Sequence, residues 1–368
     1  MKLLLILNTP PPYQGTTIMN QFLLDALQEK HIEYTHLRID SSKELKTLGK
    51  FDFNKLRSAF NILIGIYANR KDYQMAYLVM SVEGFAFYRH SIFILLLLLL
   101  KKKYILHLRG LGFRNKKGPG KILTSFIFKR SYLIQHSIYN SFDIAMFGNK
   151  KVFYVPNGWQ DYYKQFRKEV ESRIAKTTKD VNIVFLSNLI ADKGLFTVAE
   201  SMLNISLDPL FKGASIKWNF VGNWESESVK KSFFDYINAN KLYNYIGHIG
   251  PLYNDEKYLF LAGMDILTFP TFYKHETWGN VILEAMMFKI PVIATRYVAI
   301  PEMVKDNETG FLINREDPVA LADRVKVLIK DRERGKRMGE AGRRLYLQHF
   351  QLDTFKKNII EVLQTVNR

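Results

Sequence analysis

The stretch KHETWGNVILEAMM, residues 274–287, decides the fold of this chain. The apolar run DILTFPT (265–271) just before it is typical of a buried strand, and a second short strand, PVIAT, begins after it at Pro291. The stretch itself therefore holds a short loop and a helix that begins near Gly279. A strand, a loop and a helix in this order form the unit from which parallel α/β sheets are built.

Two acidic residues, Glu276 and Glu284, lie on either side of the Trp-Gly step in this stretch. The start of a helix has free N–H groups and the positive end of the peptide dipole, so it attracts phosphate. Glu276 would lie in the loop before that start, and Glu284 about a turn and a half inside the helix. Since a carboxylate repels phosphate but accepts hydrogen bonds from hydroxyls, the pattern favours a ligand with both groups, such as a sugar nucleotide. The alternative is a helix with an acidic N-terminal cap and a solvent-facing Glu284.

Length and composition indicate a globular protein of two ordinary domains. The chain has 368 residues, of which 47% are hydrophobic and 24% are charged. It contains no cysteine, which excludes a disulfide scaffold and cysteine-based metal or redox sites and fits a reducing compartment. No cluster of His, Asp and Glu has the spacing of metal ligands, so we expect no metal ion.

Two apolar segments could be mistaken for targeting or membrane segments. The first, MKLLLIL, has a short apolar run and no small-residue cleavage site after it, so it indicates a buried strand rather than a signal peptide. The second holds nine consecutive apolar residues, 92–100, which is about half of a bilayer span. A buried helix or an interfacial segment fits that length.

The basic residues are concentrated in the first half of the chain. Residues 1–180 hold 29 Lys and Arg against 13 Asp and Glu, whereas the remainder holds 24 against 22. Between Glu83 and Asp143 there are eleven basic residues and no acidic one. Such a window, next to an apolar run, suggests an anionic surface or partner, although many charge runs are only solvated faces.

We expect residues 89–130 to form a face that docks on a membrane. Its basic residues include Lys101, Lys102, Lys103, Lys116 and Lys117. Nucleic acid is not the expected partner, because the aromatic residues lie within apolar runs rather than between basic residues.

Short apolar runs alternate with amphipathic stretches throughout, which predicts two doubly wound units with a ligand cleft at the carboxyl ends of their strands. We expect an N-terminal domain at 1–165, a charged linker at 166–180, and a C-terminal domain at 181–350. A last helix, 351–368, would pack back on the N-terminal domain. The predicted strands are 2–9, 33–39, 76–81, 104–110, 143–148 and 153–158, then 182–189, 216–224, 245–252, 265–271, 291–295 and 310–313.

Five segments in order give the chain a resemblance to a known family. They are PPYQGTT, VPNG, LSNLIADKG, FVGNW, and ETWGNVILEAM followed by PVIAT and PEMVKDNETGFLI. The chain resembles the retaining, nucleotide-sugar-dependent glycosyltransferases of family 4, also called group 1. The resemblance implies the α/β GT-B fold, in which two Rossmann-like doubly wound parallel-sheet domains face a central cleft.

The resemblance implies roles for the residues of the opening stretch. Glu284 would accept the two ribose hydroxyls of the donor, a role that suits a carboxylate. Glu276 would face the transferred sugar. Backbone N–H groups around Trp278, Gly279 and Asn280, next to Thr277, would hold the pyrophosphate or the sugar.

Family members carry an Arg and a Lys in the segment SNLIADKG, and the two side chains neutralise the leaving diphosphate. Lys193 matches the Lys, but Asn188 stands at the position of the Arg. An amide donates hydrogen bonds without charge, so Lys193 or another cation must supply more of the leaving-group stabilisation. An ordinary exposed lysine at a helix start is the alternative for Lys193.

Many members present a histidine at the end of the fourth strand, where this chain reads LHLRGLGF. Arg109 takes that position, and His107 lies two residues earlier on the same strand face. Either could face the donor, and a structural histidine is the alternative for His107. Gly15, in PPYQGTT, would lie where the backbone approaches the donor and acceptor, unless it only serves a turn.

These features predict an enzyme, a hexosyltransferase that moves a sugar from a UDP- or GDP-sugar to an acceptor hydroxyl with retention of configuration. It would need no cofactor. A lipid-linked or saccharide acceptor would place it in lipopolysaccharide, O-antigen or capsule assembly, in the cytoplasm and peripheral at the inner face of the cytoplasmic membrane. The alternatives are a nucleotide-sugar 2-epimerase on the same fold and a non-catalytic protein that binds anionic surfaces.

Overall fold

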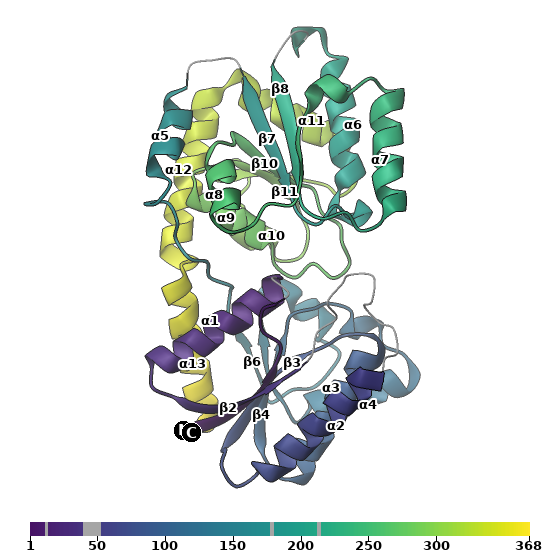
Figure 1. Ribbon diagram of the computed structural model, residues 1–368, viewed down its shortest axis with the longest axis vertical. Helices are drawn as coiled ribbons and strands as arrows, with labels where there is room; N and C mark the ends of the chain where they lie inside the picture. The colour runs from purple at the N-terminus through teal and green to yellow at the C-terminus, as the bar shows by residue number, and fades with distance from the viewer. Residues whose placement is uncertain (12–13, 40–52, 177–179, 212–214) are drawn as a thin grey trace. The chain divides into compact units, whose positions relative to one another are not determined.

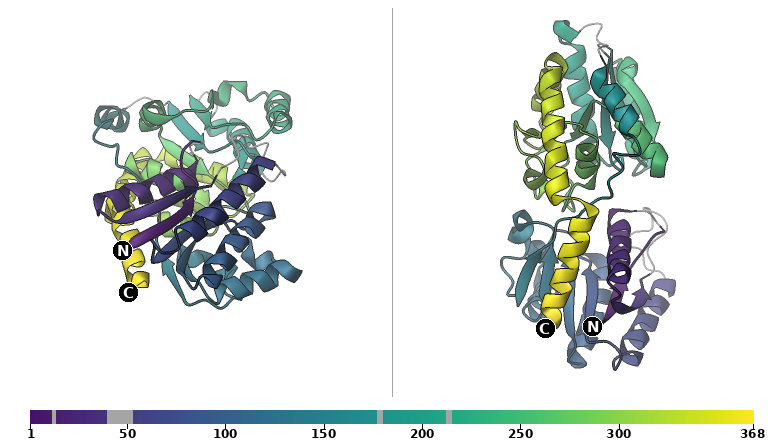
Figure 2. Two further views of the ribbon diagram at one scale, coloured as in Figure 1. Left: turned by 60° about the horizontal axis from the view of Figure 1, so that its bottom comes forward. Right: turned by 90° about the vertical axis from the view of Figure 1, so that its left-hand side faces the viewer.

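The structure is a computed structural model that describes residues 1–11, 14–39, 53–176, 180–211 and 215–368, without the side chains of residues 53–55. The chain divides into two compact units, which are described separately (Figures 1 and 2). Unit 1 comprises Met1–Gly158 and Leu352–Arg368, and unit 2 comprises Trp159–Gln351.

Unit 1 is built on a parallel sheet of six strands in the order β2-β1-β3-β4-β5-β6. The apolar run at the start of the chain forms β1, the second strand of the sheet, and Leu3 to Leu7 are fully buried. Both faces of the sheet are covered, so its central strands are apolar throughout rather than alternating. The strands are β1 (Lys2–Leu7), β2 (Glu33–Arg38), β3 (Met75–Met80), β4 (Lys103–Leu108), β5 (Tyr132–Gln135) and β6 (Lys151–Tyr154).

The helices of unit 1 form two groups. Helix α1 (Gly15–Glu29) packs against α13 (Leu352–Asn367), and the two lie side by side in Figure 1. Helix α3 (Gly84–Leu99) packs between α2 (Phe53–Ala68) and α4 (Gly118–Phe128). The inner sides of α2, α3 and α4 form one apolar core with alternate residues of the central strands. Two short 3₁₀ helices follow β4 and β5, namely η2 (Phe113–Asn115) and η3 (Ile138–Asp143).

Unit 2 repeats this plan with a second parallel sheet of six strands, in the order β12-β11-β10-β7-β8-β9. The strands are β7 (Val181–Leu186), β8 (Ile216–Val221), β9 (Ile246–Gly250), β10 (Ile266–Phe269), β11 (Val292–Thr295) and β12 (Gly310–Ile313). Neighbouring strands pair in parallel, so their carboxyl ends meet at one edge. Unit 2 therefore has the sheet predicted from its apolar runs.

The helices of unit 2 cover both faces of its sheet. Helix α6 packs against α11 on the main core of the unit, and α9 packs against α12. The helices are α5 (Arg167–Ala175), α6 (Leu195–Ser206), α7 (Glu227–Ala239), α8 (Asn254–Ala262), α9 (Asn280–Met287), α10 (Ile300–Met303), α11 (Pro318–Lys330) and α12 (Arg332–His349). The short 3₁₀ helices are η4 (Ala191–Lys193), η5 (Pro209–Phe211) and η6 (Tyr243–Tyr245).

One predicted strand, DIAMFG at 143–148, is wrong. The fifth strand of unit 1 is β5, formed by the shorter run YLIQ. Asp143 instead ends η3 and is buried, and its carboxylate accepts hydrogen bonds from the backbone N–H groups of Gly112, Phe113 and Arg114 at 3.0 to 3.2 Å. Asp143 thus fixes the loop that follows β4.

The segment expected as a linker, 166–180, differs from that expectation over its described part. Residues 167–175 form helix α5 of unit 2, and the division between the units falls earlier, after Gly158. The composition of α5 is highly charged, but Val170 is fully buried and Arg173 is held by backbone carbonyls of the unit. The leucine-rich run 92–100 lies in α3 and its C-cap. Within the described ranges, no helix is long and apolar enough to span a membrane.

Candidate functional site

The opening stretch forms the loop between β10 and α9, with Gly279 as the N-cap of α9. A Cβ atom at Gly279 would lie 2.9 Å from Ile282 and 3.1 Å from Phe269, so only glycine fits there without displacement. Trp278 is buried, and its ring packs against Phe350. The side chain of Trp278 anchors the loop, and Gly279 lets the backbone at the helix start pack closely against Ile282 and Phe269.

Glu284 is buried within α9, with 3% of its surface exposed, and it is not the solvent-facing glutamate of the alternative interpretation. Its Oε1 atom lies 2.7 Å from Nζ of Lys257, in α8. Lys257 also lies 4.5 Å from the ring of Tyr258, which stacks on Tyr162 with ring centroids 4.2 Å apart. Burial, and secondarily the charge of Glu284, raise the pKa of Tyr258 far above its ordinary value. The carboxylate of Glu284 thus lies close to aromatic rings, and Lys257 balances its charge.

Glu276 is also buried and paired with a lysine. Its Oε2 atom lies 2.5 Å from Nζ of Lys193, in η4, although the two residues are 83 positions apart in sequence. Gly194 brings them together: it adopts φ +89°, and a Cβ atom there would lie 2.3 Å from the carbonyl oxygen of Pro270. The turn after β7 can therefore pack directly on the end of β10. Lys193 is accordingly a partner of the site rather than an exposed helix-start lysine.

Asn188 is exposed on the loop after β7, the same loop that carries Lys193. Gly222, in the segment FVGNW, packs against the same loop with φ +153°, and a Cβ atom there would lie 1.8 Å from the carbonyl oxygen of Ser187. Two of the motif glycines, Gly194 and Gly222, thus hold the loop of Asn188 and Lys193 from either side. Thr277 is buried beside Glu276, and Asn280 is half-buried at the first position of α9.

In unit 1 the structure brings Arg109 and Gly15 together. Gly15 begins α1, where the backbone N–H of Gln14 donates to Oγ1 of Thr17 at 3.0 Å. Arg109 follows β4, and its Nη1 atom donates to the carbonyl oxygen of Thr16 at 3.2 Å. Burial lowers the pKa of Arg109 from its ordinary value, and Tyr77 partly offsets the effect. The two residues that the sequence assigns to one site therefore lie at one end of the sheet of unit 1.

His107 is fully buried inside unit 1. Its Nδ1 atom lies 2.5 Å from the hydroxyl of Tyr77, and its ring lies 5.3 Å from that of His136. Burial, and then the charges of Arg109 and of His136, lower the pKa of His107 well below its usual range. A neutral imidazole in this position links β3, β4 and the end of β5, so its location favours the structural alternative and we give it no role in the reaction.

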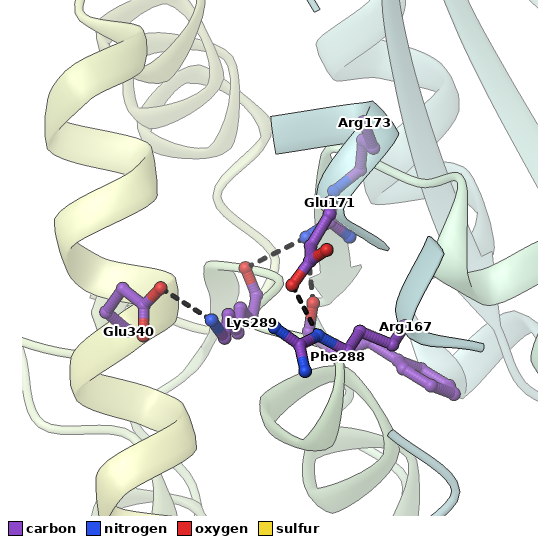
Figure 3. Close-up of polar contacts among 6 residues, drawn as sticks. All are labelled: Arg167, Glu171, Arg173, Phe288, Lys289 and Glu340. Atoms are coloured by element: carbon purple, nitrogen blue, oxygen red, sulfur yellow. Dashed lines mark hydrogen bonds and ion pairs between the residues drawn. The ribbon is translucent and has the colours of Figure 1, made fainter. Parts of the chain in front are cut away.

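Lys257 and Arg173 belong to the site region but were not found by sequence reasoning. Both lie in charged stretches that match no motif. Arg173, in α5, points at the C-terminal ends of α8 and α9, where carbonyl groups are left unpaired and the peptide dipole is negative. Figure 3 shows its contacts with the end of α9, at Phe288 and Lys289. Its guanidinium donates to four carbonyl oxygens, those of Ala262 (3.3 Å), Met264 (2.8 Å), Phe288 (2.8 Å) and Lys289 (3.3 Å).

Arg173 connects α8 with α9, which are the helices that carry Lys257 and Glu284. Burial lowers the pKa of Arg173 to about 10, so the side chain stays charged at neutral pH. Two further ion pairs lie close to Arg173 (Figure 3): Lys289 pairs with Glu340 at 2.8 Å, and Arg167 pairs with Glu171 at 2.6 Å. The charged side chain of Arg173 thus holds the C-terminal ends of both α8 and α9. Lys257 and Glu284 lie earlier in the same two helices.

The charges of the site are carried by lysines and carboxylates. In the part of the chain that the structure describes, no group of three or more His, Asp or Glu side chains is placed to hold a metal ion. The candidate site of unit 2 therefore consists of the start of α9 and two ion pairs, Lys193–Glu276 and Lys257–Glu284.

Residues 166–345, which are nearly all of unit 2, match the family of glycosyl transferases group 1. The chain is 27% identical to the capsular polysaccharide biosynthesis glycosyltransferase CapM of Staphylococcus aureus over 191 residues, which cover 51% of this chain and 47% of that protein. The matched stretch thus spans about half of the length of this curated relative.

Two solved structures share the fold over the whole chain. HepE of Anabaena, solved in complex with UDP, superimposes with a TM-score of 0.74 at 16% identity and covers 99% of this chain and 100% of HepE. Sucrose-phosphate synthase of Thermosynechococcus elongatus gives a TM-score of 0.76 at 14% identity, covering 100% and 99%. Residues 166–345 thus resemble the group 1 glycosyl transferases, and the chain has the GT-B fold.

Proposed function

We propose that the protein transfers a hexose-type sugar from a nucleoside diphosphate to an acceptor hydroxyl, with retention of the anomeric configuration. The observation that carries the proposal is the arrangement around α9. A helix start shaped by Gly279 lies between two buried carboxylates, and each carboxylate is paired with a lysine. A ligand with both phosphate and hydroxyl groups can use all of these elements.

In this proposal the nucleotide binds along α9. The carboxylate of Glu284 accepts hydrogen bonds from the ribose hydroxyls, while Lys257 balances its charge from the other side. The backbone N–H groups at 278–280 and the dipole of α9 hold the diphosphate. Trp278, which is packed on Phe350, keeps this backbone in place.

Lys193 stabilises the departing diphosphate. In the described structure its ammonium group pairs with Glu276. When a donor binds, the sugar hydroxyls approach Glu276 and the phosphates approach Lys193, so the ligand substitutes for part of the ion pair. Since Asn188 brings no charge, Lys193 carries most of the leaving-group stabilisation on this loop. Retention requires this stabilisation and a well-placed acceptor rather than a side-chain nucleophile.

We infer that the donor is a UDP- or GDP-sugar and that the acceptor is a lipid-linked saccharide or a saccharide of a cell-surface polysaccharide, such as capsule or lipopolysaccharide. Two similar proteins support this inference, since CapM acts in capsular polysaccharide biosynthesis and HepE was solved with UDP. The protein would work without a metal, at the inner face of the cytoplasmic membrane.

The test is a panel of nucleoside diphosphates and their sugars, first by thermal shift and then by transfer to saccharide and lipid-linked acceptors. A ligand that binds the folded state raises the apparent stability, so the preferred nucleotide is found first. Proton NMR of the product gives the configuration of the new linkage. An inverted linkage would contradict retention. Conversion of the nucleotide sugar to an epimer without acceptor would indicate a 2-epimerase, and binding without turnover would indicate a non-catalytic protein.

A further inference from the structure

Helices α2, α3 and α4 of unit 1 carry apolar side chains on their outer as well as their inner sides. On α2, Phe60 is 62% exposed, and on α3, Leu99 is 78% exposed. The exposed positions recur every three or four residues, which places them on one side of each helix. They are Leu56, Phe60, Ile64 and Tyr67 on α2, Phe85, Tyr88, Ile92, Leu95 and Leu99 on α3, and Ile122 and Phe126 on α4.

The core of unit 1 does not account for these side chains. A different set on the same helices is buried against the sheet, including Ile62 and Ile66 on α2, and Phe93 and Leu97 on α3. A helix that covers a sheet usually has a polar outer side. Because α3 packs between α2 and α4, the three outer sides adjoin and form one apolar surface, which we term the outer helical face. A contiguous apolar surface of this kind marks an interaction site.

The charged residues of the outer helical face are mainly basic, although Glu83, the exposed N-cap of α3, is acidic. The three helices contain no Asp or Glu. Exposed basic residues lie on them and at their ends, namely Arg57 on α2, Lys101 after α3, and Lys117, Lys121 and Lys129 around α4. Arg130 lies over the ring of Phe126, with its Cζ atom 4.0 Å from the centroid. Apolar side chains bordered by lysines and arginines are the composition of a surface that lies in the interface of a membrane.

Three lysines that the sequence assigns to this face are engaged within the protein. Nζ of Lys102 donates to the carbonyl oxygen of Tyr73 at 2.9 Å, and Nζ of Lys103 donates to that of Asn367 at 3.1 Å. Lys116 lies 3.6 Å from the ring centroid of Phe87, and burial lowers its pKa. Lys101 and Lys117 remain exposed, so they and the exposed basic residues of α4 supply the charge.

We propose that the outer helical face docks unit 1 on an anionic lipid bilayer, with the apolar side chains of α2, α3 and α4 in the headgroup region and the basic residues against acidic headgroups. The positive charge of the face favours an anionic bilayer over a second copy of the chain. A second copy of the chain would bring the same positive charge to the contact, whereas an anionic bilayer is complementary to it. The inference goes beyond the proposed reaction, because it concerns a surface of unit 1 outside the donor site of unit 2.

Vesicle sedimentation with the full chain tests the proposal. The vesicles are phosphatidylglycerol mixed with phosphatidylcholine, or phosphatidylcholine alone, each at low and high salt. We expect the wild type to bind the anionic vesicles at low salt and to bind much less at high salt, since salt screens the charges. An apolar variant, Phe60→Ser with Ile64→Ser, Ile92→Ser and Leu99→Ser, should bind at least about tenfold more weakly, because it loses apolar surface that enters the headgroup region.

A basic variant tests the second component separately. Replacing Lys101, Lys117, Lys121 and Lys129 by Ser should weaken binding to anionic vesicles about a hundredfold at low salt. The matched controls are in unit 2. For the apolar variant the control replaces the exposed Leu207, Leu210 and Val319 by Ser, and for the basic variant it replaces the exposed Lys231, Lys241, Arg337 and Arg344 by Ser.

Both control variants should bind vesicles as the wild type does, and all variants should keep the nucleotide affinity of the wild type, which shows that unit 2 is folded. The proposal is overturned if the wild type ignores anionic vesicles at low salt, or if the unit 2 controls weaken binding as much as the unit 1 variants. It is also overturned if the wild type is a dimer that the apolar variant converts to a monomer without any change in vesicle binding, because the face then contacts a second copy.

Discussion

The two units have sheets of equal size, but their buried polar groups differ in kind. Unit 2 buries carboxylates and pairs each with a lysine, in Lys193–Glu276 and Lys257–Glu284. Unit 1 buries the neutral imidazoles of His90, His107 and His136, and its buried carboxylate, Asp143, is held by backbone N–H groups rather than by a lysine. Paired charges at a helix start can exchange one partner for a ligand, whereas buried neutral rings only hold strands and helices together. In the proposed function, the same architecture serves donor binding in unit 2, while the buried rings of unit 1 support its sheet.

The exposed side chains of the two units also differ, and here unit 1 has the feature that points to an interaction. Unit 1 exposes the outer helical face, which joins apolar side chains to basic ones and has no acidic residue on its three helices. In unit 2, exposed apolar side chains such as Leu207 and Val319 lie on different elements. A protein that handles a small charged ligand with one unit and a large surface with the other would show this division.

The largest expected effect is a loss of stability of unit 1 in mild acid. Burial lowers the pKa of His90 and of His136 to about 3, against about 6.5 in an unfolded chain. Because the folded pKa is depressed, the stabilisation is complete above the unfolded value and is lost as pH falls below it. Each histidine contributes about 1.4 kcal/mol per pH unit, so the two should cost about 4 kcal/mol by roughly pH 5, and His107 adds to this.

Unit 2 should respond differently over the same range. Burial raises the pKa of Asp265 in unit 2, so the folded unit gains a proton more readily than the unfolded chain and is not weakened by this group as pH falls. All four tryptophans lie in unit 2, so their fluorescence reports its unfolding alone. Hydrogen exchange of β1, β3 and β4, corrected for the intrinsic rate at each pH, reports unit 1. Equal losses in both units would contradict the contrast.

The next effect concerns the leaving group. Lys193→Ala should lower kcat by about 10² to 10³, the cost of one preorganised electrostatic donor. Asn188→Ala, on the same loop, should cost much less, because the amide carries no charge and is exposed. Steady-state kinetics on the preferred donor give both values. Small and equal losses from the two variants would mean that neither residue contacts the diphosphate.

The sequence predicted the paired glutamates because they are tied to a local pattern. Glu276 and Glu284 flank one helix start, and their spacing, Gly279 and the flanking strands all lie within about thirty residues. Most strands were predicted for the same reason, as apolar runs between turns. β5, formed by YLIQ, was missed because the apolar run that follows Asp143 resembles a strand more closely. Asp143 itself is the last residue of a 3₁₀ helix.

The partners of the site could not be predicted in this way. Lys257 and Glu284 are 27 positions apart, and nothing in the sequence around Lys257 marks it as a partner. Arg173 was assigned to a linker because its partners are backbone carbonyls, which leave no trace in the pattern of side chains. The burial of His107 depends on packing from the whole sheet. Local motifs predict the candidate ligand-binding residues, and tertiary contacts decide what supports them.

The third prediction concerns Glu284, the buried carboxylate proposed to bind the ribose. Glu284→Ala should weaken the binding of nucleoside diphosphate by about 1.5 to 3 kcal/mol, the range for hydrogen bonds to charged groups. The single variant also leaves Lys257 buried without its carboxylate, which lowers stability. Glu284→Ala combined with Lys257→Met should recover stability but not affinity. Calorimetry and thermal unfolding separate the two, and unchanged affinity in a folded Glu284→Ala protein would refute the ribose assignment.

The smallest expected effect is at Arg173, whose proposed role is to position the helices of the site. A lysine has one compact group with three donors, so Arg173→Lys cannot reach the four carbonyls at the ends of α8 and α9 together. The protein should remain folded, but the Lys257–Glu284 pair would be held less firmly, and the KM for the donor should rise about threefold to fivefold with little change in kcat. The matched control is Arg332→Lys, because Arg332 also donates to a backbone carbonyl of unit 2, that of Asp180 at 2.9 Å, but touches neither helix end. If both variants lose stability alike and neither changes the KM, Arg173 supports the unit as a whole, and the precision of the donor site comes from the α9 loop alone.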